Sequence, residues 1–259
     1  MKNSVLLYLE FIKMKFASRI AYRLDFFASI IAFFLYQLIG PIFVGVVYYS
    51  GGKFEGWTIY ELLLLQGVAT IIQGFSFLVV FSLLWTTRRY MREGTLDLLL
   101  IRPINTLWLM VMNAFDEEDV AQVAGGLAIF FFAVYHLDKI EGSWILFALL
   151  FILGFLFFFS FALLCSAATM KFIETMRLWE FIDMMIVLAH YPRNAYSKSV
   201  GLLFSTIIPL LIAGHYPASV LMGRTLDGIQ ITIVSTIGLF AFSLFIWHKT
   251  LKSYTSAGG

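Results

Sequence analysis

The chain has 259 residues, of which 61% are hydrophobic and only 13% charged, and its mean hydropathy is +0.88. Soluble domains carry about 25% charged residues. With half that share and a net charge of +2, the chain cannot coat a water-exposed globule, which excludes a soluble domain and predicts an all-α integral membrane protein.

Six apolar stretches predict six transmembrane helices, preceded by a helix in the membrane interface. The predicted spans cover about residues 24–49, 61–85, 120–136, 144–170, 199–214 and 228–247, and the interfacial helix covers residues 1–23. Apolar side chains at helical spacing, with basic residues among them, indicate that first helix. In the first span, Gly40-Pro41 predicts a kink, because proline removes one backbone hydrogen bond.

The third span has 17 residues, which is at the short end of the spanning range. An acidic cluster, FDEED at residues 115–119, precedes it. We interpret the acids Asp116, Glu117, Glu118 and Asp119 as a helix cap, because the helix macrodipole favours negative charge at this end. A cation or proton site is the alternative.

The fifth span is predicted to be broken. Pro209 frees one backbone carbonyl, and Gly214 and Pro217 interrupt the helix again within eight residues. Broken helix survives in a membrane only where it is buried in protein or lines a wet cavity. We therefore predict that residues 213–224 form a short re-entrant helix near the outer surface. The alternative is a kinked helix followed by an ordinary outer loop.

The placement of basic residues predicts the topology. With a cytoplasmic N-terminus, fifteen Lys and Arg residues fall in the inner segments, including Arg193 and Lys198 before the fifth span. The outer segments hold Lys53, Lys139 and Arg224. This asymmetry follows the positive-inside rule and places both termini in the cytoplasm.

Soluble catalytic motifs are missing from the sequence. It contains no GxxxxGK[ST] phosphate loop, no HExxH and no GxSxG. The single cysteine, Cys165, lies in a Phe-rich run and is interpreted as a packed membrane residue. The predicted spans also have no ionisable residue at mid-depth, which argues against ion coupling. We expect no catalytic residue, metal or cofactor in this chain.

One polar segment is too patterned for a passive linker. In RRYMREGTLDLLLIRPIN, residues 88–105, basic residues precede a helix-breaking Gly94, an apolar patch and Arg102-Pro103. This predicts a structured inner loop, with a plain amphipathic cytoplasmic loop as the alternative. A short helix bearing Leu96, Leu99 and Leu100 could enter an apolar groove of a partner.

This segment resembles the inner loop of type-2 ABC transporter permeases, in which a glycine, leucines and Arg-Pro-Ile follow the second span. A later stretch, HYPRNAYSKSVGLLFSTIIPLLIAGHYPASVLMGR, is also similar to the family. Its matching features are Tyr191-Pro192, Pro209, Tyr216-Pro217-Ala218 and Gly223. The resemblance extends over essentially the whole chain in span number and spacing, whereas the acidic cluster is not part of the family pattern.

The resemblance implies the membrane subunit of an ABC exporter in the cytoplasmic (inner) membrane of a prokaryote. Its implied partners are two cytoplasmic ATP-binding subunits, which would bind ATP and Mg, a second identical or related permease subunit and membrane lipids; no nucleic acid is expected. The implied ATPase-coupling residues are Arg88, Arg89, Arg92, Glu93, Gly94, Leu96, Asp97, Leu99, Leu100, Arg102 and Pro103. The implied outer gate comprises Pro209, Gly214, His215, Tyr216 and Pro217.

Two other functions stay open on the residues. One is a secondary transporter or channel, and the other is a membrane-embedded enzyme or assembly factor. The first needs intramembrane charges or inverted repeats, and the second needs a polar constellation at depth. Drugs, peptides, lipids and glycans all remain candidate cargo.

Overall fold

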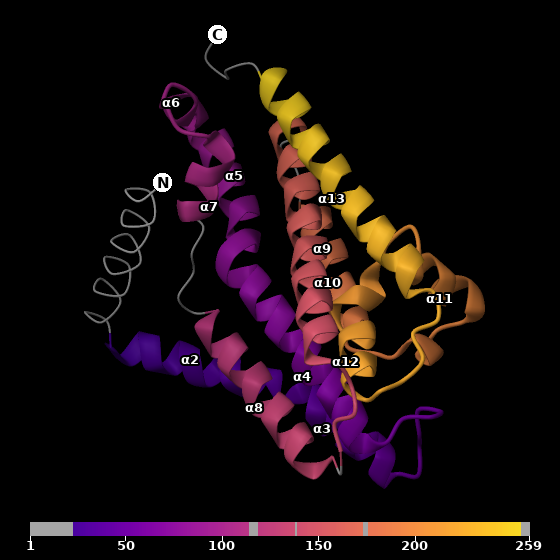
Figure 1. Ribbon diagram of the computed structural model, residues 1–259. Helices are drawn as coiled ribbons and strands as arrows, with labels where there is room; N and C mark the ends of the chain where they lie inside the picture. The colour runs from indigo at the N-terminus through magenta and orange to yellow at the C-terminus, as the bar shows by residue number, and fades with distance from the viewer. Residues whose placement is uncertain (1–22, 114–118, 138, 173–175, 255–259) are drawn as a thin grey trace.

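The computed structural model describes residues 23–113, 119–137, 139–172 and 176–254, and folds them into helices joined by short turns (Figure 1). The first half contains α2 (Arg23–Gln37), α3 (Ile39–Tyr49), α4 (Ile59–Ser76), the π-helical η1 (Phe77–Phe81), α5 (Ser82–Glu93), α6 (Leu96–Leu100), α7 (Thr106–Asn113) and α8 (Val120–His136). The second half contains α9 (Trp144–Lys171), α10 (Met176–Ala189), η2 (Arg193–Ala195), α11 (Lys198–Ser205), η3 (Leu210–Ala213), α12 (His215–Leu221) and α13 (Ile229–Lys252). Residues 1–22 of the predicted interfacial helix and most of the acidic cluster, residues 115–118, lie outside the described residues.

Four stretches of helix are long and apolar enough to cross a membrane. They are Phe27–Tyr49, Ile59–Glu93, Trp144–Lys171 and Ile229–Lys252, and α8 is a shorter apolar helix. Large apolar side chains on α2, α3, α8, α9 and α13 are exposed, as lipid contact requires. The chain is therefore a multi-pass membrane protein, and five of the six predicted spans coincide with apolar helices.

Proline and capping residues explain two helix boundaries. The first span breaks at Leu38, between α2 and α3, because Pro41 has no N–H to donate to the carbonyl of Gln37. The predicted kink is confirmed. The second span begins at Ile59, where Thr58 accepts a hydrogen bond from the N–H of Glu61 and the Glu61 side chain accepts one from the N–H of Thr58.

The second span is longer than predicted. We expected it to end near residue 85 and the inner loop to begin there, but α4, η1 and α5 continue to Glu93. Thr86 and Thr87 are buried within this continuous helix, and a threonine in a helix can donate its hydroxyl to its own backbone. Thr87 donates to the Leu83 carbonyl at 2.7 Å.

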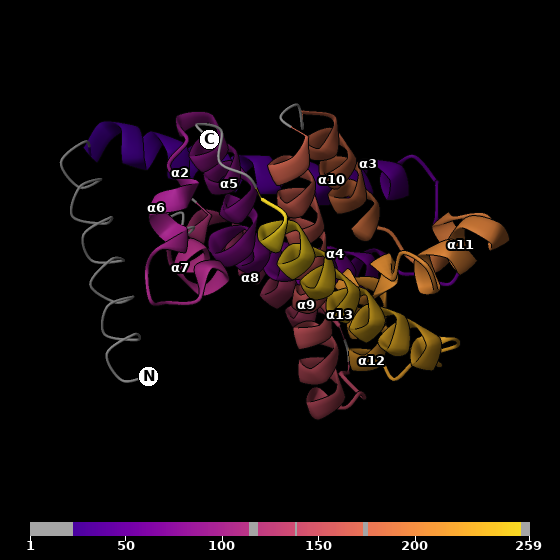
Figure 2. The ribbon, with the colours of Figure 1, turned by 90° about the horizontal axis from the view of Figure 1, so that it is seen from above.

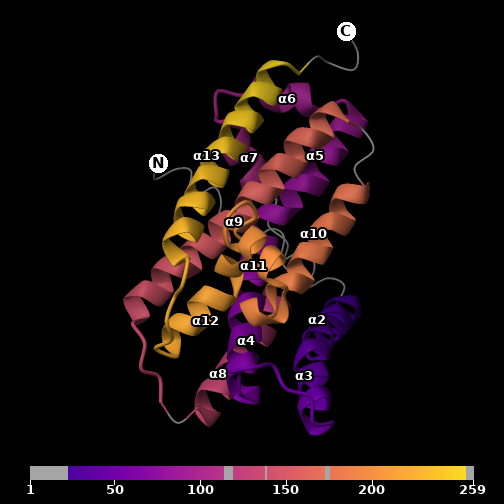
Figure 3. The same cartoon turned by 90° about the vertical axis from the view of Figure 1, so that its right-hand side faces the viewer.

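The fifth predicted span, residues 199–214, is broken at Pro209 as predicted. Residues 199–214 form the short α11 and η3, separated at Thr206 to Pro209, and neither piece is long enough to cross a membrane. Instead α10, which we expected in an inner segment, runs alongside α9 from the end near α6 toward the opposite end (Figures 1 and 3). Glu180 and Asp183 on α10 concealed this helix from a search for apolar runs.

The helical bundle has two ends, which differ in the elements they hold. The α6 end holds α6 and the last turns of α9 and α13, where Leu96 and Leu99 pack with Met170 and Trp247. The α12 end holds the loop at residues 50–58, the loop at 139–143 and the segment 190–228 (Figure 1). Hydrogen bonds to the carbonyls of Glu55 and Gly56 fix that segment beside the first loop.

This arrangement corrects the predicted placement of two basic residues. Arg193 and Lys198 lie at the α12 end, with Lys53, Lys139 and Arg224, because α10 carries the chain there. Thirteen of the eighteen Lys and Arg residues then remain in the segments predicted as inner. The charge asymmetry is weaker than predicted but keeps its sign.

The core depends on close contact between α4 and α8. Gly67 and Gly74 of α4 face α8, and a Cβ atom at Gly67 would lie 2.7 Å from the backbone nitrogen of Phe130. A Cβ at Gly126 would lie 2.9 Å from the nitrogen of Ile71. Small residues allow membrane helices to approach this closely. Seen from the α6 end, α2 and α3 run along one edge of this bundle (Figure 2).

Candidate functional site

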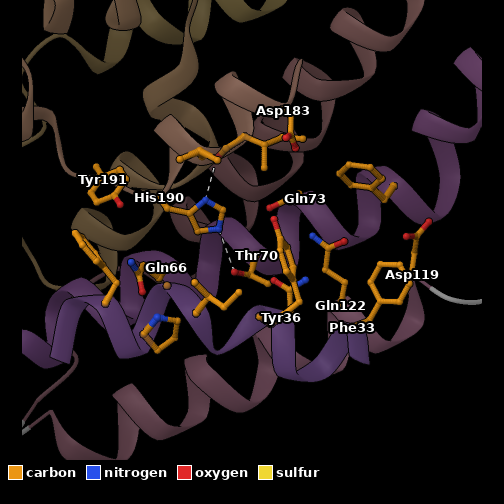
Figure 4. Close-up of a pocket in the computed structure, with 18 residues that line it drawn as sticks. Phe33, Tyr36, Gln66, Thr70, Gln73, Asp119, Gln122, Asp183, His190 and Tyr191 are labelled. Carbon is orange, nitrogen blue, oxygen red and sulfur yellow. Dashed lines mark hydrogen bonds between the residues drawn. The ribbon is translucent and has the colours of Figure 1, made fainter. Parts of the chain in front are cut away.

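A polar cleft of about 500 Å³ lies between the α2–α3 junction, α4 and α10, with the start of α8 at one end (Figure 4). Aromatic and aliphatic side chains form much of its wall. Its polar lining consists of Tyr36, Gln37, Gln66, Thr70, Gln73, Asp119, Gln122, Asp183, His190 and Tyr191. Such a concentration of polar groups in a chain that is 61% hydrophobic marks a candidate binding site.

One face of α4 supplies the centre of the cleft. Gln66, Thr70 and Gln73 follow one another at spacings of four and three residues, so they share a face of the helix. All three side chains are buried. The neighbouring face, with Gly67 and Gly74, packs on α8. This α4 therefore has a packing face and a polar face.

His190 reaches from the end of α10 toward this polar face (Figure 4). Its Nε2 lies 3.2 Å from the hydroxyl oxygen of Thr70, and its Nδ1 lies 2.8 Å from the carbonyl oxygen of Ile186. A carbonyl can only accept, so Nδ1 carries a proton. In the neutral ring Nε2 then accepts a hydrogen bond from Thr70. This contact links α4 to α10 across the cleft.

One buried acceptor in the cleft is unused. Gln66 is 2% exposed, and its Oε1 atom has no hydrogen-bond partner among the described residues. A buried polar atom without a partner costs free energy, and such atoms are rare in native proteins. The cleft therefore offers an amide oxygen to a bound molecule that carries a hydrogen-bond donor.

The charge of the cleft is acidic. Asp119 and Asp183 line it, whereas its described lining contains neither lysine nor arginine. Asp119 also corrects an expectation, because its side chain makes no capping hydrogen bond to α8, although it occupies the cap position. It lines the cleft instead. The cleft can thus accept a molecule with hydrogen-bond donors or positive charge.

This cleft was not predicted from the sequence. We expected no ionisable residue at mid-depth of a span because His190 and Asp183 were predicted to lie in an inner segment. A usable signal was present in the second span, where Gln66, Thr70 and Gln73 recur on one helical face of an otherwise apolar run. Such a polar stripe indicates a buried or wet face.

The five predicted gate residues lie in one segment that packs against the core. Pro209 precedes η3, and a Cβ at Gly214 would lie 2.5 Å from the carbonyl oxygen of Ala189, so the segment passes directly over the end of α10. Tyr216 is buried and donates from its hydroxyl to the Asp227 carbonyl at 2.9 Å. His215 lines a second cleft, which is described below.

We expected Pro217 to interrupt a helix, but it does not. It occupies the third position of α12, which covers His215–Leu221. A proline is tolerated in the first helical turn, where its missing N–H has no intrahelical partner. A short helix therefore does occur within residues 213–224.

The predicted coupling residues form the end of α5, α6 and the turn after it. Gly94 ends α5 in a left-handed conformation, with a φ of 63°, which confirms it as a helix breaker. Of the three leucines predicted to enter a partner groove, Leu96 and Leu99 are buried in the chain's own core and only Leu100 is exposed. Leu98 and Ile101 are the most exposed apolar side chains of α6 and its following turn, at 58% and 79%, and Ile104 is exposed as well. Arg89, Arg92, Arg102 and Pro103 are also exposed.

Among the described residues, no three His, Cys, Asp or Glu side chains lie close enough together to hold a metal ion. The candidate sites are therefore the polar cleft and the two ends of the bundle.

The chain belongs to the ABC-2 family of transporter proteins, whose family pattern it matches over residues 34–258. No curated protein matches the chain. Members of this family are membrane permeases of ABC transporters, which associate with ATP-binding subunits and have no ATPase activity of their own. The family resemblance expected from the two loop motifs is confirmed.

Proposed function

We propose that this chain is the membrane subunit of an ATP-driven exporter, coupled to separate cytoplasmic ATP-binding subunits at its α6 end. The exposed apolar pair Leu98 and Ile101, on a segment that also exposes Arg102, carries the proposal. Apolar side chains at the water-facing end of a membrane protein indicate a protein contact. Two ATP-binding subunits and a second permease subunit, identical or related, would complete the complex, with ATP and Mg bound by the ATP-binding subunits.

The polar cleft is proposed as part of the substrate path. It joins α10 and α4 with the α2–α3 break. The segment from Pro209 to α12 passes over the end of α10 at Gly214, next to the residue that precedes His190, and we propose that it forms the gate at the outer surface. This orientation places the α6 end in the cytoplasm, as the basic residues favour.

A photo-cross-linking experiment tests the coupling. A photoreactive amino acid is placed at position 98, 101 or 99 of the tagged chain, in cells that express the complex. Leu98 and Ile101 point outward, whereas Leu99 of the same helix is 4% exposed and serves as the matched control. We expect cross-links to an ATP-binding subunit from positions 98 and 101, and none from 99. A complex that hydrolyses ATP but gives no cross-link from 98 or 101 would contradict the proposal.

A secondary transporter is the second candidate, since His190 and Asp183 line the cleft. Such a transporter would work without an ATP-binding subunit. Co-purification separates the two functions, because the exporter should retain an ATP-binding subunit through purification and the secondary transporter should not.

A further inference from the structure

A second cleft, with a volume of about 780 Å³, opens at the α12 end. Three separate parts of the chain line it: Trp57 from the loop before α4, the segment from Arg193 to Leu202, and the segment from His215 to Asp227. In Figure 1 these segments lie together around α11 and α12. This cleft is distinct from the polar cleft in the bundle, which has neither arginine nor lysine in its described lining.

Positive charge dominates the second cleft. Arg193, Lys198 and Arg224 line it, and Asp227 is the one acidic residue in its described lining. Arg224 is held in place, since its Nη2 lies 2.6 Å from Glu61 Oε1 and its guanidinium lies 4.3 Å from the centre of the Trp57 ring. Arg193 donates from Nη1 to the Asp227 carbonyl at 3.1 Å, which leaves further N–H donors of its guanidinium for a ligand.

Two buried polar atoms in this cleft have no partner among the described residues. The Ser219 side chain is 2% exposed, and its hydroxyl makes no hydrogen bond with a described residue. The same holds for Nδ1 of His215. A buried hydroxyl in this situation needs a partner, because losing its water without replacement costs free energy. Both side chains line the cleft.

The walls of the cleft are also fixed before any ligand binds. The Asp227 carbonyl accepts from both Arg193 and Tyr216, so one loop holds two of the lining segments together. Asn194 donates to the carbonyl of Glu55 and ties the third part to them. Leu202, which lines the same cleft, is exposed and apolar. Fixed donors around a common space favour an acceptor-rich anion.

We propose that this cleft binds a phosphate group, with Arg193, Lys198 and the Ser219 hydroxyl as its donors and Leu202 beside any attached hydrocarbon chain. Charged oxygens accept hydrogen bonds from guanidinium, ammonium and hydroxyl groups, and a phosphate offers three or four of them. The phosphate can come from an anionic lipid headgroup or from free phosphate in solution. The site does not depend on the coupling proposed above.

Native mass spectrometry of the full-length protein in detergent tests the site. The probes are phosphatidylglycerol, which carries an anionic phosphate, and diacylglycerol, which has the same hydrocarbon chains and no phosphate. We expect phosphatidylglycerol to be retained at least about fivefold more than diacylglycerol. Arg193→Gln should weaken this binding about tenfold and Lys198→Gln about threefold, since the first loses a charged hydrogen bond and the second an exposed cation. Lys139→Gln, an exposed lysine at the same end outside the cleft, should bind as the unmodified chain does.

Millimolar inorganic phosphate distinguishes the two sources. Loss of bound phosphatidylglycerol on adding phosphate would indicate a site open to free anions, whereas retention would indicate a lipid-headgroup site. Arg193→Lys keeps the charge and Ser219→Ala removes only the hydroxyl, so they replace Arg193→Gln if that variant does not fold. Equal retention of both lipids, or unchanged phosphatidylglycerol binding in Arg193→Gln and Lys198→Gln, would overturn the proposal. The test requires no ATP-binding subunit, so its result is separate from that of the coupling experiment.

Discussion

The hydroxyl oxygen of Thr70 lies 3.2 Å from Nε2 of His190, although 120 residues separate them in the chain. Thr70 belongs to the second predicted span, and His190 follows the last turn of α10. Their contact crosses the polar cleft and fixes the position of α10 against α4. A transport protein that opens this cleft has to break or move this contact.

Replacing Thr70 by valine should weaken the link between the two helices. Thr70→Val keeps the shape of the side chain but removes the hydroxyl, which leaves His190 Nε2 without that partner. We expect a loss of about 1 kcal/mol in the free energy of unfolding, the usual size for a hydrogen bond between membrane helices. The measurement is denaturation in mixed micelles. Thr206→Val is the control, because Thr206, which follows the last residue of α11, donates from its hydroxyl to the Leu202 carbonyl of that adjoining helix. Equal effects of the two changes would contradict the role given to this contact.

The α4–α8 contact predicts different outcomes for two Gly→Ala substitutions. Gly67→Ala would place a methyl group 2.7 Å from the Phe130 nitrogen and force the helices apart. We expect it to destabilise the protein by about 2 kcal/mol. At Gly238 of α13 a Cβ meets no atom within 4 Å, so Gly238→Ala should be neutral or stabilising by up to about 1 kcal/mol. The same micelle denaturation measures both, and a harmless Gly67→Ala would show that α4 and α8 are not closely packed.

Substitutions of two adjacent leucines of α6 should separate an effect on protein stability from an effect on binding to the ATP-binding subunit. Leu99 is buried, so Leu99→Ala should cost about 3 kcal/mol of stability. Leu98 is exposed, so Leu98→Ala should leave stability within about 0.5 kcal/mol of the unmodified chain. As a central contact to an ATP-binding subunit, however, its loss should reduce the co-purified subunit about fivefold. Undiminished co-purification by Leu98→Ala would place the contact elsewhere.

The ion pair between Arg224 and Glu61 joins the α12 end to the start of α4. Its atoms lie 2.6 Å apart, and both side chains are half-buried. A double-mutant cycle with Arg224→Ala, Glu61→Ala and the combined variant should give a coupling energy of about 1.5 kcal/mol, between the values for exposed pairs and for buried charged hydrogen bonds. Arg224→Lys should recover only part of it, because lysine has no planar group to stack on Trp57. Strictly additive effects would show that the pair contributes no stability.

The hydropathy of the sequence predicted most of the long apolar helices. The boundaries of α8 and the start of α9 coincide with the predicted ones, because long runs without charge end at polar turns there. Hydropathy did not predict α10 as a membrane helix, because Glu180 and Asp183 interrupt its apolar pattern. A helix that lines a cleft carries polar residues because these residues face the cleft. A hydropathy pattern therefore does not predict such a helix, although functional residues are concentrated on it.

The candidate sites were predictable only in part. The inner-loop segment around Gly94 could be predicted from the sequence. Whether Leu98 or Leu99 is exposed, however, depends on which face of α6 packs on Met170 and Trp247. The pairing of Thr70 with His190, and that of Arg224 with Glu61, joins residues more than a hundred positions apart. Such contacts are set by packing between helices, which one sequence does not specify.

Thr70 offers a direct test of whether the polar cleft is a substrate path driven by ATP. In a Cys165→Ala background, which removes the single native cysteine, Thr70→Cys is reconstituted in vesicles with its ATP-binding subunits. A membrane-impermeant maleimide is applied to either side, with and without ATP and Mg. We expect the labelling rate at position 70 to change with nucleotide, with access from one side replaced by access from the other. Labelling at one constant rate in all nucleotide states, or none from either side, would contradict it.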